Sequence, residues 1–156
     1  PLVDQLAEFA PGTSVVPLPV GPNIVSTAIC YEIVYPALAR QSVADGSQLL
    51  TTITNDAWYG QSSAPYQHFE MASMRAIEQG RYLARAANTG ISGVVDPYGR
   101  VVRRSGIFEQ EGIVAEVRLL TSRTIYSVIG DAVAHLSIML TVGLLAAAEW
   151  RTLRRS

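Results

Sequence analysis

The stretch NIVSTAICYEIVYPALARQSVADGSQLLTTITND, residues 23–56, decides the fold class. Residues 23–29 and 48–54 are short apolar runs dominated by β-branched side chains, which predict two buried strands. Between them, residues 35–45 have a helical pattern that ends at Gly46, with Pro36 at an early position where its missing N–H is harmless. The order strand, helix, strand predicts a layered α/β domain.

Working outward, the flanking segments extend this domain. We expect a short strand at Ser14–Val16, a loop over 55–65 and a long helix from Tyr66 to about Ala87. Residues 91–105, ISGVVDPYGRVVRRS, read as a hairpin with Pro and Gly in its turn, and GIVAEVRL (112–119) reads as a further strand.

The last part of the chain differs in kind. Residues 132–148, AVAHLSIMLTVGLLAAA, contain no charged side chain, and a helix of this length spans about 25 Å, slightly less than a hydrocarbon core. Part of 125–130 can extend the helix. Arginines follow it at 151, 154 and 155, so the positive-inside rule places the C-terminus in the cytoplasm. A buried helix of a soluble domain is the alternative.

Composition excludes several classes of function. A net charge of −1 gives no sign of nucleic-acid binding, and one cysteine with two distant histidines supports neither a disulfide framework nor a metal site. The chain opens without a signal peptide or an initiating Met, which we interpret as a segment of something longer. All 12 basic residues are arginines, so any reaction that needs a lysine must take it from another segment.

The single cysteine, Cys30, is the first candidate for chemistry. A lone cysteine in an apolar strand is more often a small buried hydrophobe, but the carboxyl end of a strand in an α/β sheet is also where catalytic groups collect. Glu32 is either a base or polar anchor with its own donors, or an acid at the start of a helix. Residues alone leave both choices open.

The loop NDAWYG (55–60) is the second candidate. Asn55 and Asp56 are expected mainly to fix the loop, whereas Trp58 and Tyr59 either line an apolar pocket or seal the edge of the core. His68 and Glu70 read as an exposed or capping pair. Arg81 and Arg85 read as a solvated or ion-paired face.

Five motifs in one order carry a family resemblance: AICYE, NDAWYG, QHFEMASMRAIEQGRYLARAANTGIS, DPYGR and TIYSVIGD, followed by the hydrophobic helix. They resemble the apolipoprotein N-acyltransferases, membrane-bound members of the nitrilase (carbon–nitrogen hydrolase) superfamily. The match runs from about Ile24 to the C-terminus. The resemblance implies part of a nitrilase-type αββα sandwich over 1–125, one transmembrane helix over 126–150 and a basic cytoplasmic tail over 151–156.

The resemblance also implies the reaction and its site. A cysteine takes an acyl chain from a phospholipid as a thioester and passes it to the N-terminal amine of a diacylglyceryl-cysteine lipoprotein. Cys30 matches the nucleophile, Glu32 the required acidic neighbour, and the backbone N–H of Tyr31 the expected oxyanion donor. Trp58, Asn55 and Tyr59 are the expected substrate contacts. We expect no cofactor and no metal ion.

The implied setting is the inner membrane of a bacterium, with the catalytic domain periplasmic and the chain monomeric. Phospholipid donor, lipoprotein acceptor and membrane are the implied partners. The family takes its catalytic glutamate and lysine from upstream of the cysteine; this chain has no lysine, and Glu8 does not fit the glutamate. We therefore expect the chain alone to be inactive. Two alternatives stay open, a soluble nitrilase-type amidase and a catalytically dead, membrane-tethered fragment.

Overall fold

The computed structural model describes residues 12–154, and Glu8 and Arg155 lie outside this range. Six strands form one sheet in the order β1-β2-β3-β4-β5-β6. Their bounds are β1 Leu18–Val20, β2 Asn23–Ile29, β3 Leu49–Asn55, β4 Leu83–Asn88, β5 Gly93–Val95 and β6 Val101–Arg104. The three central strands β2, β3 and β4 are parallel, and β1, β5 and β6 join antiparallel at the edges. The predicted α/β class is confirmed.

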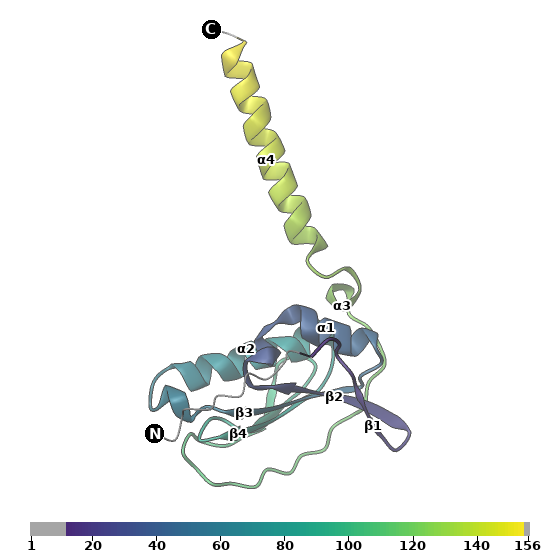
Figure 1. Cartoon of the computed structure of the whole chain (residues 1–156), viewed down its shortest axis with the longest axis vertical. Helices are drawn as coiled ribbons and strands as arrows, with labels where there is room; N and C mark the ends of the chain where they lie inside the picture. Colours follow the sequence, from purple (N-terminus) through teal and green to yellow (C-terminus); the bar gives the residue numbers. More distant parts are fainter. Residues whose placement is uncertain (1–11, 155–156) are drawn as a thin grey trace.

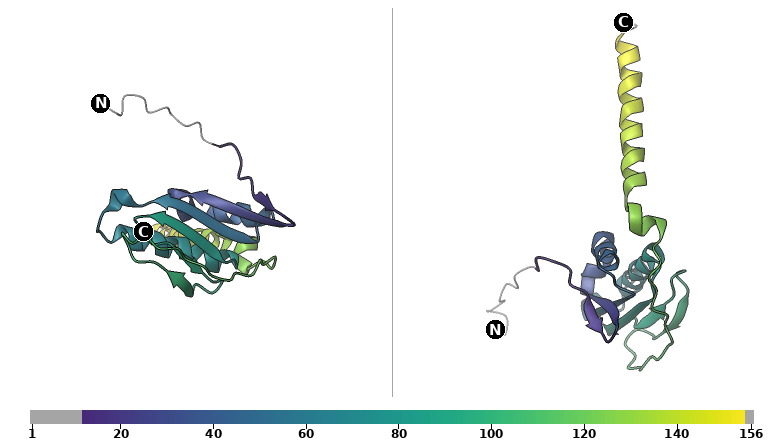
Figure 2. Two further views of the ribbon diagram at one scale, coloured as in Figure 1. Left: turned by 90° about the horizontal axis from the view of Figure 1, so that it is seen from below. Right: turned by 90° about the vertical axis from the view of Figure 1, so that its right-hand side faces the viewer.

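The helices lie on one side of this sheet. They are α1 Pro36–Ala44, α2 Ala64–Gln79, α3 Ile125–Ile129 and α4 Ala132–Leu153, with two 3₁₀ turns, η1 Cys30–Val34 and η2 Ala57–Tyr59. In Figure 1, α1 and α2 cover the upper face of the sheet and α4 projects away from the same side. Figure 2 gives the same arrangement from two further directions.

The core fills the space between the helices and the sheet. Phe69, Ala72 and Ala76 of α2 pack with Leu50 and Leu83 of the strands, and all five side chains are buried. This packing sets the register of the sheet, because a one-residue shift would turn these strand residues to the other face.

The opposite face of the sheet is open. Ile29 and Ile53, which pair in register on β2 and β3, are 59% and 51% exposed. Residues 23–29 and 49–55 form the two predicted strands, but the expectation that they are buried is wrong for the side chains of this face. Helices cover only one face within residues 12–154, so each strand alternates between buried and exposed positions.

The predicted helix over 66–87 is also wrong beyond residue 79. Gly80 adopts φ 61°, and its left-handed conformation ends α2 with hydrogen bonds back to Ala76 and Ile77 carbonyls. Residues 83–88 then form β4 between β3 and β5. Leu83 and the alanines of this segment favour helix formation in isolation, but a central sheet position overrides that preference.

Two expected strands are placed differently. Residues 14–16 precede β1 and are not part of the sheet, and residues 112–119 form no ladder. Residues 112–124, here called the strap, have no regular secondary structure and run along the edge of the domain. Leu120 N–H donates to Gln48 O at 3.2 Å, and Thr124 Oγ1 donates to Glu78 O. One backbone and one side-chain hydrogen bond therefore anchor the strap to the domain, without pairing it as a strand.

The junction between α3 and α4 is fixed by Arg40 of α1. Its Nε donates to Ser127 O at 3.1 Å and its Nη2 to Val128 O at 2.9 Å, so it satisfies carbonyls at the C-terminus of α3. Gly130 follows with φ 56° and breaks the helix. Residues 125–130 therefore do not extend α4, which begins at Ala132.

Helix α4 is long and apolar enough to cross a membrane. The candidate span Ala132–Arg151 has 20 residues, and none of its surface is buried within the structure. Within residues 12–154, α4 packs against no other element in Figure 1, so the structure does not support the alternative of a buried helix.

Candidate active site

The chain turns sharply at Cys30. The residue directly follows β2, begins η1 and has φ 54°, a left-handed value that non-glycine residues rarely adopt. As a whole it is half-buried and carries a free thiol. A strained turn at the carboxyl end of a parallel strand holds a side chain clear of the sheet, and such strain is found preferentially at functional sites.

Glu32 is folded back onto the strand end. Its Oε2 accepts a hydrogen bond from the Ile29 N–H at 2.7 Å, which is the glutamate half of a capping box, since the isoleucine side chain offers no acceptor for the other half. The carboxylate thereby satisfies the backbone donor immediately before Cys30. Its observed contact is that of a polar anchor for the turn.

Tyr31 follows Cys30 in the turn, and its ring centroid lies 5.9 Å from that of His68. Its ring is about half exposed and meets Tyr35 edge to face, with centroids 5.9 Å apart. The backbone N–H of Tyr31 belongs to the first turn of η1, where helical geometry supplies no internal acceptor. It is therefore a donor that a developing negative charge could use.

A buried polar cluster of Asp56, His68 and Arg85 lies beside the Cys30 turn. Asp56 Oδ2 accepts from Arg85 Nη2 at 2.7 Å, and Asp56 Oδ1 lies 3.0 Å from His68 Nδ1. All three side chains are nearly inaccessible to solvent. A charged pair this deeply buried is stable only when each partner satisfies the other.

The hydrogen-bonding role of His68 Nδ1 follows from these contacts. His68 Nδ1 lies 3.0 Å from the Asp56 carboxylate and 3.1 Å from Arg85 Nη2. The nitrogen can donate or accept but not both, and the carboxylate can only accept, so the consistent assignment is Nδ1–H donating to Asp56. His68 Nε2 is then a buried acceptor without a hydrogen-bond partner.

Burial and charge together set the electrostatics of this region. Desolvation lowers the pKa of Arg85, and the adjacent Asp56 carboxylate and the nearby Cys30 oppose that effect. Desolvation raises the pKa of Tyr59, and the negative charges of Asp56 and Cys30 raise it further. Cys30 therefore lies within electrostatic range of the Asp56–Arg85 ion pair.

The backbone is shaped to admit the cluster. Gly90 passes so close to Asp56 that a Cβ at residue 90 would lie 2.3 Å from Oδ2. Arg85 Nε also donates to Ile91 O at 3.1 Å, and Thr54 Oγ1 donates to Asp56 Oδ1 at 3.0 Å. No residue larger than glycine fits at position 90 without moving the carboxylate.

The three expected substrate contacts occupy the rim of this edge. Trp58 is 84% exposed and so does not seal the core. Tyr59 stacks edge to face on His68 at 6.2 Å between centroids. Asn55 Oδ1 accepts from Ala57 N–H at 3.1 Å and from Asn88 Nδ2 at 3.2 Å, a loop-fixing role.

Sequence reasoning missed the cluster. His68 is buried and bound to Asp56 rather than exposed or capping, and Arg85 is ion-paired but not solvated. Arg81 is buried too and donates to backbone carbonyls. The available signal was the period of α2, since His68 shares a helical face with Ala72 and Ala76, the most buried residues of the helix.

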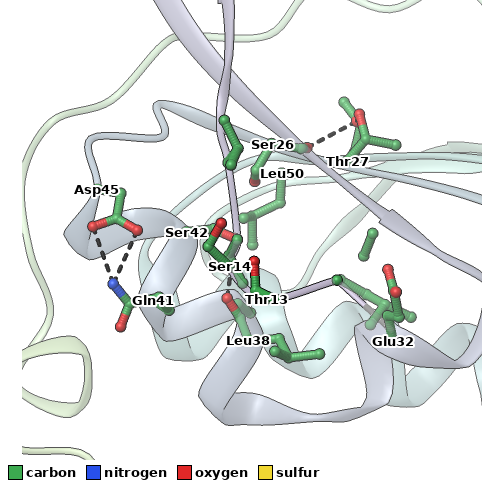
Figure 3. Close-up of a pocket in the computed structure, with 17 residues that line it drawn as sticks. Thr13, Ser14, Ser26, Thr27, Glu32, Leu38, Gln41, Ser42, Asp45 and Leu50 are labelled. Carbon is green, nitrogen blue, oxygen red and sulfur yellow. Dashed lines mark hydrogen bonds between the residues drawn. The ribbon is translucent and has the colours of Figure 1, made fainter. Parts of the chain in front are cut away.

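A cavity of about 770 Å³ lies elsewhere, between α1, β2 and residues 12–16 (Figure 3). Ser26, Leu38, Ser42 and Leu50 line it, and Glu32 and Ile33 are its residues from the Cys30 turn. Because neither Cys30 nor Trp58 lines it, this cavity is not where an acyl group would meet the thiol. Among residues 12–154, no group of three or more His, Cys, Asp or Glu could hold a metal ion.

Comparisons with known proteins agree with the fold and the motif order. A carbon-nitrogen hydrolase family model matches residues 4–126. The apolipoprotein N-acyltransferase of Geobacter metallireducens is 41% identical over 133 residues, covering 85% of this chain and 26% of that protein. The enzyme of the same name from Gloeobacter violaceus is 45% identical over 129 residues, covering 82% of this chain and 24% of that protein.

Solved structures of a nitrilase-superfamily amidase support the same fold and family. An amidase of the nitrilase superfamily from Nesterenkonia matches with a TM-score of 0.52 and 28% identity, over 64% of this chain and 40% of that one. In one structure of that amidase, acrylamide has added to the active-site cysteine. The present chain spans about a quarter of the length of the curated relatives it matches.

Proposed function

The chain belongs to the carbon–nitrogen hydrolase family, and from that premise we propose that it is the nucleophile-bearing part of an apolipoprotein N-acyltransferase. The observation that carries the proposal is the Cys30 turn, in which a half-buried free cysteine directly follows a parallel strand in a left-handed conformation. The names of the similar enzymes supply the reaction, and α4 supplies a means of holding the site near lipid.

In the first step, Cys30 Sγ attacks the ester carbonyl of a phospholipid. The carbonyl oxygen becomes an oxyanion, to which the Tyr31 N–H can donate, and the lysophospholipid leaves as its alcohol. The acyl group remains on sulfur as a thioester. In the second step, the amine of the lipoprotein's N-terminal cysteine attacks the thioester and releases the thiol, forming an amide.

In this scheme, Glu32 holds the turn and the buried cluster supports it from behind. The hydrogen bond from Ile29 N–H fixes the residue before the nucleophile, and Arg85 is a fixed cation within electrostatic range of the thiol. The proton-transfer groups are not assigned to this chain, which has no lysine. We therefore propose that residues 1–156 alone do not turn over.

The proposed setting follows from the C-terminal helix. Arg151 and Arg154 follow the apolar part of α4, so the positive-inside rule places them in the cytoplasm and the sheet domain in the periplasm. We propose a catalytic unit over 1–125 and a transmembrane unit that begins at Ala132 rather than at 126, because α3 and Gly130 separate residues 125–130 from α4. The proposed partners are phospholipid and lipoprotein, and the proposed state is a monomer.

A chimera tests the reaction. Residues 24–156 would replace the matching segment of the Geobacter metallireducens enzyme, which is similar enough for the two to be exchanged. We expect phospholipid to add one acyl mass to Cys30, hydroxylamine to remove it, and an apolipoprotein to receive it. The matched control is Cys30→Ser in the same chimera. Acyl transfer by that variant would overturn the nucleophile assignment.

The alternative of a nitrilase-type amidase has its own support in the Nesterenkonia structures, one of which contains butyramide. The chimera separates the two proposals when it is assayed with butyramide and with phospholipid in parallel. Amide hydrolysis without acyl transfer would favour the amidase. A folded, membrane-inserted chimera that does neither would favour the catalytically dead tether.

A further inference from the structure

The helix layer of the domain faces the side from which α4 leaves. In Figure 1, α1 and α2 lie between the sheet and the start of α4, and the right-hand view of Figure 2 agrees. If α4 crosses a bilayer, the outer faces of α1, α2 and α3 therefore point toward that bilayer, and the open face of the sheet points away from it.

The outer face of α2 carries apolar side chains at its centre. Ala72 and Ala76 form the middle of the buried face, and Met74 lies two residues from each, so it projects on the side directly opposite the core. Met71 and Ile77 flank it on the same outer face. The three side chains are 41–47% exposed.

Helix α3 continues this apolar surface beside the start of α4. Ile125, Val128 and Ile129, spaced i, i+3 and i+4, form one outward face, while Ser127 is buried on the other. The hydrogen bonds of Arg40 hold α3 in this orientation. The apolar face of α3 is thus a fixed feature and not the product of a loose linker.

Charge contributes little to this surface. Arg40 is bound to backbone carbonyls, and Arg75 pairs with Glu78 at 2.8 Å. Glu70 is exposed and acidic. A partner held here must therefore be bound by apolar contact and not by anionic groups.

We propose that Met71, Met74, Ile77, Ile125, Val128 and Ile129, here called the resting strip, lie in the headgroup region of the bilayer that α4 crosses. The partner is a lipid surface, chosen because the strip is continuous with the root of the span. Amphipathic surfaces of this type bury their apolar face about 5–10 Å into the interface.

The resting strip leads to the proposed active site. Arg75 Nη1 donates to Val34 O at 3.0 Å, which ties the middle of α2 to the turn that begins at Cys30. A domain lying on this strip holds the thiol turn beside the lipid surface. This inference rests on the proposed membrane insertion of α4 and adds how the site reaches a phospholipid.

Site-specific fluorescence quenching tests the inference on the full chain. In a Cys30→Ser background, the variants Met74→Cys, Ile53→Cys and Leu140→Cys would each carry an NBD fluorophore in phosphatidylcholine vesicles. Ile53 is the matched control, because it is also apolar and about half exposed but lies on the opposite face. Leu140 reports insertion of α4.

We expect nitroxide at the headgroup to quench the label at residue 74 roughly fivefold more than the label at 53, as for a shallowly inserted surface. Deep nitroxide should quench the label at 140. Added phosphatidylglycerol should not increase quenching at 74, since the strip has no free cation among its six residues.

The outcomes separate this inference from the proposed function. Quenching at 140 with equal, weak quenching at 74 and 53 overturns the resting strip and leaves the acyltransferase proposal intact. No quenching at 140 overturns both the strip and the membrane setting. Loss of acyl transfer in the chimera leaves all three signals unchanged, because they report position and not chemistry.

Discussion

Two buried arginines four residues apart, Arg81 just before β4 and Arg85 within it, are held in opposite ways. Arg81 precedes the strand and donates to main-chain carbonyls, including Ser47 O at 2.8 Å and Ser122 O of the strap. Arg85 pairs with the Asp56 carboxylate at 2.7 Å. Burial lowers the pKa of both side chains.

The difference teaches how the two ends are stabilised. Hydrogen bonds from Arg81 to neutral carbonyls hold the strap at the amino end of the sheet. If Arg81 is replaced, these carbonyls lose their donor, but local opening lets water hydrogen-bond to them. At the carboxyl end, losing Arg85 leaves a charge inside the protein. Arginine is therefore replaceable at position 81, where its partners are neutral carbonyls, but not at position 85, where its partner is a buried carboxylate.

The largest expected effect comes from Arg85→Gln. The variant leaves Asp56 buried without its cation, which should reduce the free energy of unfolding by about 3–5 kcal/mol. Urea unfolding in detergent measures it. Adding Asp56→Asn should restore part of the loss, because the orphaned charge is removed. A double variant as unstable as the sum of the single variants would contradict the buried pair.

Arg81→Gln should have a smaller effect, about 1.5–3 kcal/mol, because it removes charge-assisted hydrogen bonds without orphaning a charge. Limited proteolysis should also become faster within residues 112–123, where the strap loses its fastening. Arg123→Gln is the control: Arg123 is exposed and its charge lowers the pKa of Arg81, so its removal should not weaken the strap. Unchanged proteolysis in Arg81→Gln would show that the strap is held elsewhere.

Gly130→Ala probes the junction between α3 and α4. The residue has φ 56°, and a Cβ there would lie 3.1 Å from the Arg40 guanidinium. We expect a loss of about 1 kcal/mol from the left-handed conformation. Gly143→Ala is the matched control, since a Cβ at position 143 meets nothing within 4 Å and alanine favours helix. Equal stability of the two variants would argue against a fixed junction.

The smallest effect concerns pH. Desolvation raises the pKa of Glu78, Arg75 opposes this and Asp131 adds to it. Because the folded pKa lies above the unfolded value of 4.5, the folded state binds a proton first as pH falls. Wild type should therefore gain stability relative to Glu78→Gln between pH 7 and pH 5. A stability difference independent of pH would contradict the shift.

The sequence predicts the elements whose signals are local. Strand β2, helix α1, strand β3 and the β5–β6 hairpin lie where β-branched runs, Pro36 and turn residues place them. Gly80 was also a local signal, but residues 83–88 have the composition of a helix, and only a sheet position between two other strands makes them β4. The strap was misread because its alternating pattern has no neighbouring strand to pair with.

The candidate site divides in the same way. Cys30 and Glu32 lie within one turn, so the motif that contains them identified them together. Asp56, His68 and Arg85 are 12 to 29 residues apart, and their meeting depends on how β3, α2 and β4 pack. From the sequence alone, each of these side chains is most simply interpreted as a surface residue. Only the fold shows that three polar residues share one dry space.

The left-handed turn at Cys30 has a consequence for stability. A non-glycine residue in this conformation costs about 1–2 kcal/mol, a penalty that glycine avoids. The most stable version of this turn would therefore have no thiol, and Cys30→Gly should unfold at a higher urea concentration than Cys30→Ala. If the thiol is the nucleophile, the chain keeps a reactive side chain at a position where glycine would make the folded state more stable.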